Sequence, residues 1–136
     1  MILLDTSILS LAYRRRHRTE PAPHAVEILR QLILDDAPLS IPGIVFQEVL
    51  SGVRTEAQFE RLLRALETFP IITAEPKHHI LAARNANACR RKGVATSTVD
   101  CLIAALATCS GASLFTLDED FVRMAPICGL KLFRKS

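Results

Sequence analysis

Aromatic residues and glycine are scarce in this sequence. It contains no tryptophan, one tyrosine, six phenylalanines and five glycines among its 136 residues. No G-x-G-x-x-G or G-K-[ST] phosphate loop occurs, which argues against a nucleotide-binding module built on such a loop. Because aromatic side chains are so few, any nucleic-acid binding is expected to depend little on base stacking.

Long apolar runs are also missing. No run approaches the roughly 18 to 20 residues that a membrane-spanning helix needs. The first apolar run, 1–4, is stopped by Asp5, where a signal peptide would continue its apolar stretch. The sequence therefore predicts a cytoplasmic protein without membrane contact.

The four cysteines follow no metal-binding or redox pattern. They include no C-x-x-C pair and do not alternate with histidine, which argues against a structural zinc site and a thioredoxin-like motif. We expect reduced, buried thiols, with Cys101 and Cys109 on the same face of one apolar helix.

Length and composition predict one domain over residues 1–136. A chain of this length that is 49% hydrophobic and 23% charged can bury a sizeable core. Short apolar segments alternate with longer amphipathic ones, which predicts a three-layer α/β/α sandwich with a short central parallel sheet. Strands are expected at 1–4, 39–41, 71–73, 113–117 and 130–133, and helices at 8–13, 24–36, 42–52, 55–66, 76–92 and 99–109.

Positive charge is clustered although the formal net charge is only +3. Clusters of this kind suit a phosphate backbone, but they also suit a solvated loop or the C-termini of helices. The main clusters lie at 14–18, 90–92 and 134–135.

Four acidic residues stand at positions where chemistry is plausible. Asp5 and Asp118 directly follow predicted strands, and ligands of open α/β sheets bind beyond the carboxyl ends of strands. Asp100 falls in the first turn of an apolar helix, and Glu48 projects near the apolar face of another. Each has a structural alternative, because Asp5 and Asp118 can cap the following helices, Asp100 can complete a capping box with Ser97, and Glu48 can pair with an arginine.

If these acids lie close together in the fold, they predict a metal site. Three or four carboxylates that meet at one sheet edge repel one another and need a cation. Hard oxygen ligands suit Mg²⁺ or Mn²⁺. Such an ion can activate water for attack on a phosphodiester, so convergence would predict a nuclease.

The same acids carry a resemblance to a known family. Asp5 in D-T-S after the first strand, Glu48 in V-F-Q-E-V, Asp100 in T-V-D-C-L-I-A-A and Asp118 in T-L-D-E-D-F resemble, in order, the four motifs of PIN domains. In its length and in the residues of these motifs, the chain is most similar to VapC-like toxins. The resemblance implies the PIN-like fold and a metal-dependent endoribonuclease of a toxin–antitoxin system.

The resemblance also implies roles for individual residues. It implies that Asp5, Asp100 and Asp118 hold the metal, and that Glu48 binds it directly or through water and orients the attacking water. Either Asp118 or Asp120 is the closer ligand, and Asp118 is favoured because it is nearer the strand end. The family's hydroxyl positions, which imply hydrogen bonds to the carboxylates, fall on Thr6, Ser7 and Thr116.

The resemblance to this family also implies three partners. They are an RNA substrate cut to leave a 5′-phosphate and a 3′-hydroxyl, a second copy of the chain in a homodimer, and a VapB-like antitoxin that blocks the site. The basic run after the first helix would then hold the RNA backbone. Its candidate RNA contacts are Arg14, Arg15, Arg16 and Arg18.

Other functions are less well supported. A haloacid-dehalogenase-like phosphatase needs a second Asp where Ser7 stands. The four histidines are expected at the surface rather than in a nucleophilic site: His17, His24, His78 and His79. The remaining alternative is a catalytically silent PIN-like module that binds RNA or protein, which the loss of one of the four acids would favour.

Overall fold

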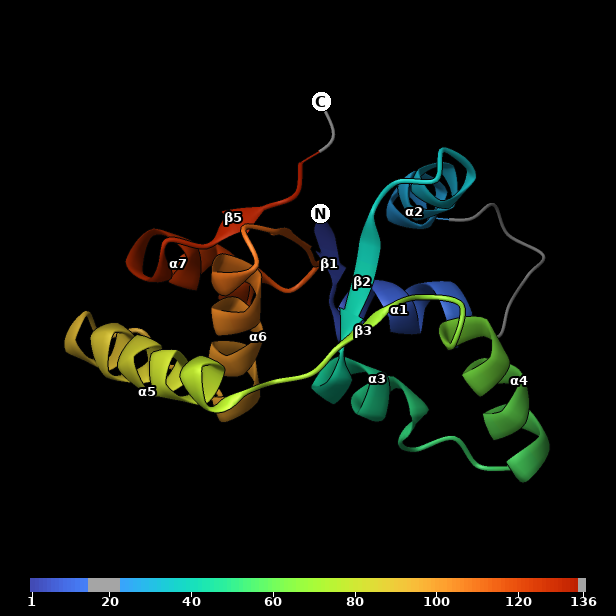
Figure 1. The fold of residues 1–136 in the computed structure, drawn as a ribbon, viewed down its shortest axis with the longest axis horizontal. Helices are drawn as coiled ribbons and strands as arrows, with labels where there is room; N and C mark the ends of the chain where they lie inside the picture. The colour runs from blue at the N-terminus through green and yellow to red at the C-terminus, as the bar shows by residue number, and fades with distance from the viewer. Residues whose placement is uncertain (15–22, 135–136) are drawn as a thin grey trace.

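A five-stranded parallel sheet forms the centre of the molecule in the computed structural model, which describes residues 1–14 and 23–134 (Figure 1). The strand order is β3-β2-β1-β4-β5. Leu3 of the central strand is in register with Ser40 on one side and Leu114 on the other. The strands are β1 (Ile2–Leu4), β2 (Leu39–Pro42), β3 (Ile71–Ile72), β4 (Ser113–Phe115) and β5 (Lys131–Leu132).

Helices cover both faces of the sheet. The described residues form α1 (Thr6–Tyr13), α2 (His24–Leu34), α3 (Gly43–Leu50), α4 (Glu56–Leu66), α5 (Pro76–Arg91), α6 (Thr98–Cys109) and α7 (Glu119–Cys128). Figure 1 shows α1 to α4 to one side of the strands and α5 to α7 to the other. The predicted three-layer α/β/α architecture is confirmed. None of the described helices combines the length and the apolar character required to cross a bilayer.

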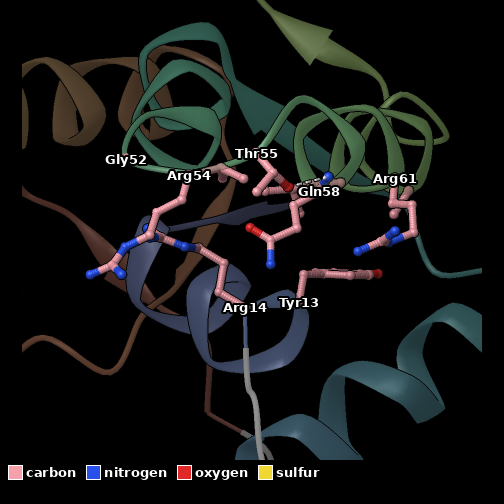
Figure 2. Close-up of a pocket in the computed structure, with 10 residues that line it drawn as sticks. Tyr13, Arg14, Gly52, Arg54, Thr55, Gln58 and Arg61 are labelled. Atoms are coloured by element: carbon pink, nitrogen blue, oxygen red, sulfur yellow. Dashed lines mark hydrogen bonds between the residues drawn. The ribbon is translucent and has the colours of Figure 1, made fainter.

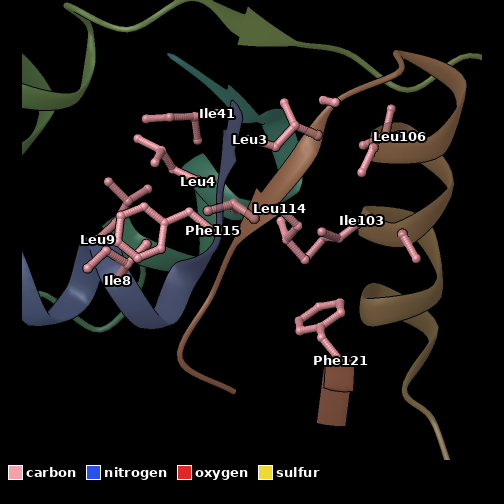
Figure 3. Close-up of a cluster of buried hydrophobic side chains, with 14 of the residues drawn as sticks. Leu3, Leu4, Ile8, Leu9, Ile41, Ile103, Leu106, Leu114, Phe115 and Phe121 are labelled. Carbon is pink, nitrogen blue, oxygen red and sulfur yellow. The ribbon is translucent and has the colours of Figure 1, made fainter. Parts of the chain in front are cut away.

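The core lies on both sides of β1 and β4. Strands covered on both faces are continuous apolar runs rather than alternating ones, which explains why the short runs in the sequence predict them. Figure 3 shows Ile8 and Leu9 of α1 on one side of Leu114, and Ile103 of α6 and Phe121 of α7 on the other, and all five side chains are fully buried. Burying side chains of this size stabilises the fold by about 1.5 to 3 kcal/mol each.

One helix lies outside the predicted helical ranges. Helix α7 begins after Asp118, whose side chain accepts a hydrogen bond from the Asp120 N–H, and ends at Gly129 with a positive φ of 67°. Pro126 lies inside it, and proline within a helix normally indicates a break. Its buried residues, Phe121 and Met124, are spaced three apart and hold the helix on the core.

Two expectations about burial are wrong. Cys109 is exposed whereas Cys101 is buried, because eight residues at 3.6 per turn leave the two side chains about 80° apart around the helix. His78 is buried, and its Nδ1 accepts a hydrogen bond from the Glu75 N–H at 2.9 Å. That bond caps α5, so His78 has a structural role that a surface position would not give it.

The packing of α7 against the sheet predicts a stability difference between neighbouring residues. Phe121→Ala empties a fully buried site and is expected to lower the free energy of unfolding by about 3 to 5 kcal/mol. Val122, which is 38% exposed, is the matched control. Val122→Ala is expected to change the free energy of unfolding by less than about 0.5 kcal/mol. Urea unfolding of both variants measures the difference, and equal losses would contradict this packing.

Candidate metal centre

Two acidic residues stand side by side where two neighbouring strands end. Asp5 follows β1 and occupies the N-cap position of α1, and Asp118 lies at the N-cap of α7 shortly after β4. Leu4 pairs with Phe115 in the parallel register, so both chains leave the sheet at the same edge. The Asp5 N–H donates to the Phe115 carbonyl at 3.0 Å and extends this pairing by one residue.

Three carboxylates converge at this edge. One oxygen from each of Asp100, Asp118 and Asp120 lies within 4.8 Å of the others, and all three residues are half-buried. Asp100 comes from the first turn of α6, where the Ser97 hydroxyl accepts from its backbone N–H at 3.0 Å. Within residues 1–14 and 23–134, no other group of three or more acidic, histidine or cysteine side chains meets in this way.

Asp5 lies beside this cluster and is held by two hydroxyl groups. Its Oδ2 accepts hydrogen bonds from Thr116 Oγ1 at 2.7 Å and from Ser7 Oγ at 2.9 Å. The two hydroxyls are 3.3 Å apart, the longest of the three contacts, as expected when both protons point to the carboxylate. Ser7 Oγ also accepts from the Leu117 N–H at 2.9 Å, so the hydroxyls link the ends of β1 and β4.

The sequence motif around Asp118 and Asp120 brings both side chains to the centre. Asp118 Oδ1 accepts from the Asp120 N–H at 2.9 Å, while the Asp118 N–H donates to Thr116 Oγ1 at 3.0 Å. Asp120 also forms an ion pair with Arg123, one turn further along α7. Arg123 was not among the predicted site residues, although its i,i+3 spacing from Asp120 is the pattern of a helical ion pair.

Glu48 is placed differently from the aspartates. It is exposed on α3 rather than directed into the apolar face, and it is not part of the group of three converging acids. Its Oε1 accepts a hydrogen bond from Thr6 Oγ1 at 3.0 Å. Thr6 therefore contacts Glu48, whereas Ser7 and Thr116 contact Asp5.

The predicted RNA contacts are only partly described. Arg14 follows α1 and is exposed, and its backbone N–H donates to the Ser10 carbonyl. Arg15, Arg16 and Arg18 lie outside the described residues.

Burial and the neighbouring carboxylates raise the pKa of Asp100. Burial raises the pKa of its carboxyl group from 3.8 to about 6, with further increases from the charges of Asp118, Asp5 and Asp120. The Ser97 side chain opposes the shift by hydrogen bonding. A cation among these acids would offset the repulsion, and an all-oxygen donor set fits Mg²⁺ or Mn²⁺ better than a softer metal.

The raised pKa of Asp100 predicts a pH-dependent stability in the metal-free protein. The folded state takes up a proton at Asp100 more readily than the unfolded state, so this group's contribution to the free energy of unfolding falls as pH rises from about 4 to about 6. In EDTA at pH 7, Asp100→Asn is expected to raise the free energy of unfolding by on the order of 1 kcal/mol.

Urea unfolding between pH 4.5 and 7.5 tests this expectation, with exposed Glu67→Gln as the control. The stability difference between Asp100→Asn and the unmodified chain should grow with pH, and that for Glu67→Gln should stay constant. A constant difference for Asp100→Asn would show that folding does not raise the pKa of the Asp100 carboxyl group.

Comparison with known proteins finds relatives over most of the chain. The model of the PIN domain family matches residues 2–126. Ribonuclease VapC11 of Mycobacterium tuberculosis and VapC ribonuclease Mb1587 of Mycobacterium bovis are each 32% identical to the chain over 133 residues, which is 96% of this chain and 96% of each relative.

Solved structures show the same fold at lower sequence identity. FitAcB from Neisseria gonorrhoeae matches with a TM-score of 0.75 and 22% identity, over 98% of this chain and 97% of that one. VapBC2 from Rickettsia felis, bound to a DNA fragment from its promoter, matches with a TM-score of 0.75 and 23% identity over the whole of both chains. By its family model and its 32% identical relatives, the chain belongs to the PIN-domain family, among its VapC ribonucleases.

Proposed function

We propose that this protein is the toxin of a VapBC-like toxin–antitoxin pair and acts as a metal-dependent endoribonuclease. The observation that carries the proposal is the convergence of Asp100, Asp118 and Asp120 at the carboxyl edge of the sheet, in a chain related to VapC ribonucleases. The substrate is RNA, and the reaction hydrolyses a phosphodiester bond to leave a 5′-phosphate and a 3′-hydroxyl.

The converging aspartates would hold Mg²⁺, with Mn²⁺ as a substitute. Asp100, Asp118 and Asp120 offer oxygen ligands to one point, and we assign Asp5, whose charge acts on Asp100, as a further ligand beside them. When bound, such an ion supplies Lewis-acid chemistry that favours ionisation of water and offsets the negative charge developing on the phosphate. We assign both Asp118 and Asp120 as ligands, because each offers a carboxylate oxygen to the same point. Which of the two lies closer to the ion stays a prediction.

The remaining polar residues orient this centre. Thr116 and Ser7 fix the Asp5 carboxylate through their hydroxyl groups. Thr6 holds the exposed carboxylate of Glu48, which is free to accept a proton from the attacking water as it adds to phosphorus. The bond from phosphorus to the 3′-oxygen then breaks, and the 3′-oxygen takes a proton from solvent.

Two protein partners complete the proposal. The solved structures similar to this chain include VapBC assemblies from Rickettsia felis and Salmonella typhimurium. By analogy, a VapB-like antitoxin covers the acidic centre and blocks cleavage, and two copies of the chain form a homodimer.

Cleavage of labelled RNA tests the proposed chemistry. The purified protein is expected to cut RNA in Mg²⁺ or Mn²⁺ and to stop in EDTA. Asp118→Asn removes one ligand charge and is expected to lower the rate by at least about 100-fold. Glu119→Gln is the matched control, because Glu119 is an exposed acid between the two proposed ligands.

The outcomes separate the proposal from its alternatives. Equal loss in Glu119→Gln would show that general negative charge, not the cluster, matters. Cleavage that survives in Asp118→Asn would indicate a contaminating nuclease. Binding of RNA without any cleavage by the unmodified chain would favour the catalytically silent PIN-like module.

The hydroxyl network predicts a positioning role for Thr116. Thr116→Val keeps the side-chain volume but removes the 2.7 Å donor to Asp5. Because groups that orient ligands typically change metal affinity or activity by about 10- to 100-fold, we expect a loss of that size in apparent Mn²⁺ affinity. Exposed Thr73→Val is the control, and an unchanged Mn²⁺ titration in Thr116→Val would contradict the role.

A further inference from the structure

A basic cavity lies away from the acidic centre. It has a volume of about 670 Å³ and lies between the end of α1, the turn after α3 and one side of α4. Three arginines line it, Arg14, Arg54 and Arg61, and no acidic residue is among its described lining residues. None of these arginines forms a salt bridge with another described residue.

The backbone brings these arginines together from separate elements. Gly52 has a positive φ of 84°, which favours glycine, and this turn places Arg54 at the cavity. A Cβ at Gly52 would lie 3.6 Å from Nη2 of Arg14, so the Arg14 guanidinium packs close to this turn. Arg61 projects from the second turn of α4 on the other side of the cavity (Figure 2).

Polar and aromatic groups lie between the arginines. Figure 2 shows the Gln58 amide and the Tyr13 ring directed into the space between α4 and α1, with Arg14 and Arg54 to one side and Arg61 to the other. Phe69 holds the Tyr13 ring in an edge-on contact, with the ring centroids 6.4 Å apart. The Thr55 cap at the N-terminus of α4 also lines the cavity, and the helix dipole there adds to the positive potential.

This combination of groups matches a nucleotide strand. Guanidinium groups bind phosphate through paired hydrogen bonds. An aromatic ring can stack on a base, and an amide offers both a donor and acceptors to a base edge. An acidic peptide would also pair with the arginines, but it offers no flat base on which the Tyr13 ring could stack.

The cavity is within reach of a strand held at the acidic centre. Helix α1 carries Thr6, the partner of Glu48, at its first residue and Tyr13 at its last. The seven steps of 1.5 Å between these residues separate them by about 10 Å along the helix axis, which is about three stacked nucleotides at 3.4 Å per strand step. One RNA strand can therefore occupy both.

We propose that this cavity is a second RNA subsite, in which Arg14, Arg54 and Arg61 bind backbone phosphates while Tyr13 and Gln58 contact a base. The inference rests on the proposed ribonuclease function, since the bound strand is its substrate. The subsite holds the RNA a few nucleotides from the scissile bond, so it affects long substrates and not a dinucleotide.

RNA binding without cleavage tests this subsite directly. The affinity of a labelled single-stranded RNA is measured in EDTA, over a range of salt, for Arg54→Gln combined with Arg61→Gln. We expect about a tenfold loss of affinity and a decrease of about 0.7 in the salt slope for each phosphate contact removed. The control is Arg64→Gln combined with Lys131→Gln, which removes the same charge from exposed positions outside the cavity and outside the basic clusters, and should change affinity by less than about twofold.

The other outcomes would overturn the subsite. Equal losses in both double variants would mean that RNA responds only to overall charge. Oligoglutamate is the probe for an acidic protein segment as the competing occupant. If the Arg54/Arg61 variant binds oligoglutamate more weakly but binds RNA normally, the cavity binds an acidic protein segment instead. Thermal unfolding of both variants shows that they are folded.

Cleavage assays separate this inference from the proposed function. If both are correct, the Arg54/Arg61 variant has a raised KM for long RNA and an unchanged rate on a dinucleotide. If only the subsite is wrong, both substrates are cut with the unmodified chain's constants. If the ribonuclease function is wrong, no substrate is cut, while the binding comparison in EDTA still reports on the cavity.

Discussion

Repulsion among carboxylates at one edge of the sheet is the constraint on which the rest of this structure depends. Asp100, Asp118 and Asp120 meet within 4.8 Å, and burial with the nearby charges raises the pKa of Asp100 to about 6. A fold gains nothing in stability from holding ionised acids so close. The proposed metal-dependent cleavage explains the arrangement, because a divalent cation would offset this repulsion. Membership of the PIN-domain family agrees with that proposal.

The parallel sheet and its helices provide the rigidity that such a centre needs. Pairing of Leu4 with Phe115 brings the two strand ends together, and the Ser7 and Thr116 hydroxyls tie them to Asp5. Asp100 is placed by α6, which is almost entirely buried from Ile103 to Ala107. The acids therefore lie at the ends of elements that the core holds in place, which is the support that a preorganised site needs.

The sequence predicts the parts of this arrangement that depend on local pattern. Apolar runs that end in Asp5 or Asp118 indicate strands with acids at their carboxyl ends, and Ser97 indicates the start of α6. Features that depend on tertiary contacts could not be predicted in this way. Pro126 argues against a helix where the structure has α7. Asp120 joins the acidic cluster only because α7 packs back on the core. The arginine cavity combines residues from three separate segments of the chain. Glu48 is exposed because α3 turns it away from the apolar face. The spacing of residues in the sequence does not determine how the helix is rotated about its axis.

Calorimetric titration of the metal-free protein with Mn²⁺ at pH 7.5 tests the central claim most directly, because it measures cation binding without reference to any RNA. The account predicts saturable binding to the unmodified chain and to Glu119→Gln, and strongly weakened binding to Asp118→Asn. Mn²⁺ binding of equal affinity to all three proteins would show that the converging aspartates do not form the metal site, and would contradict the account.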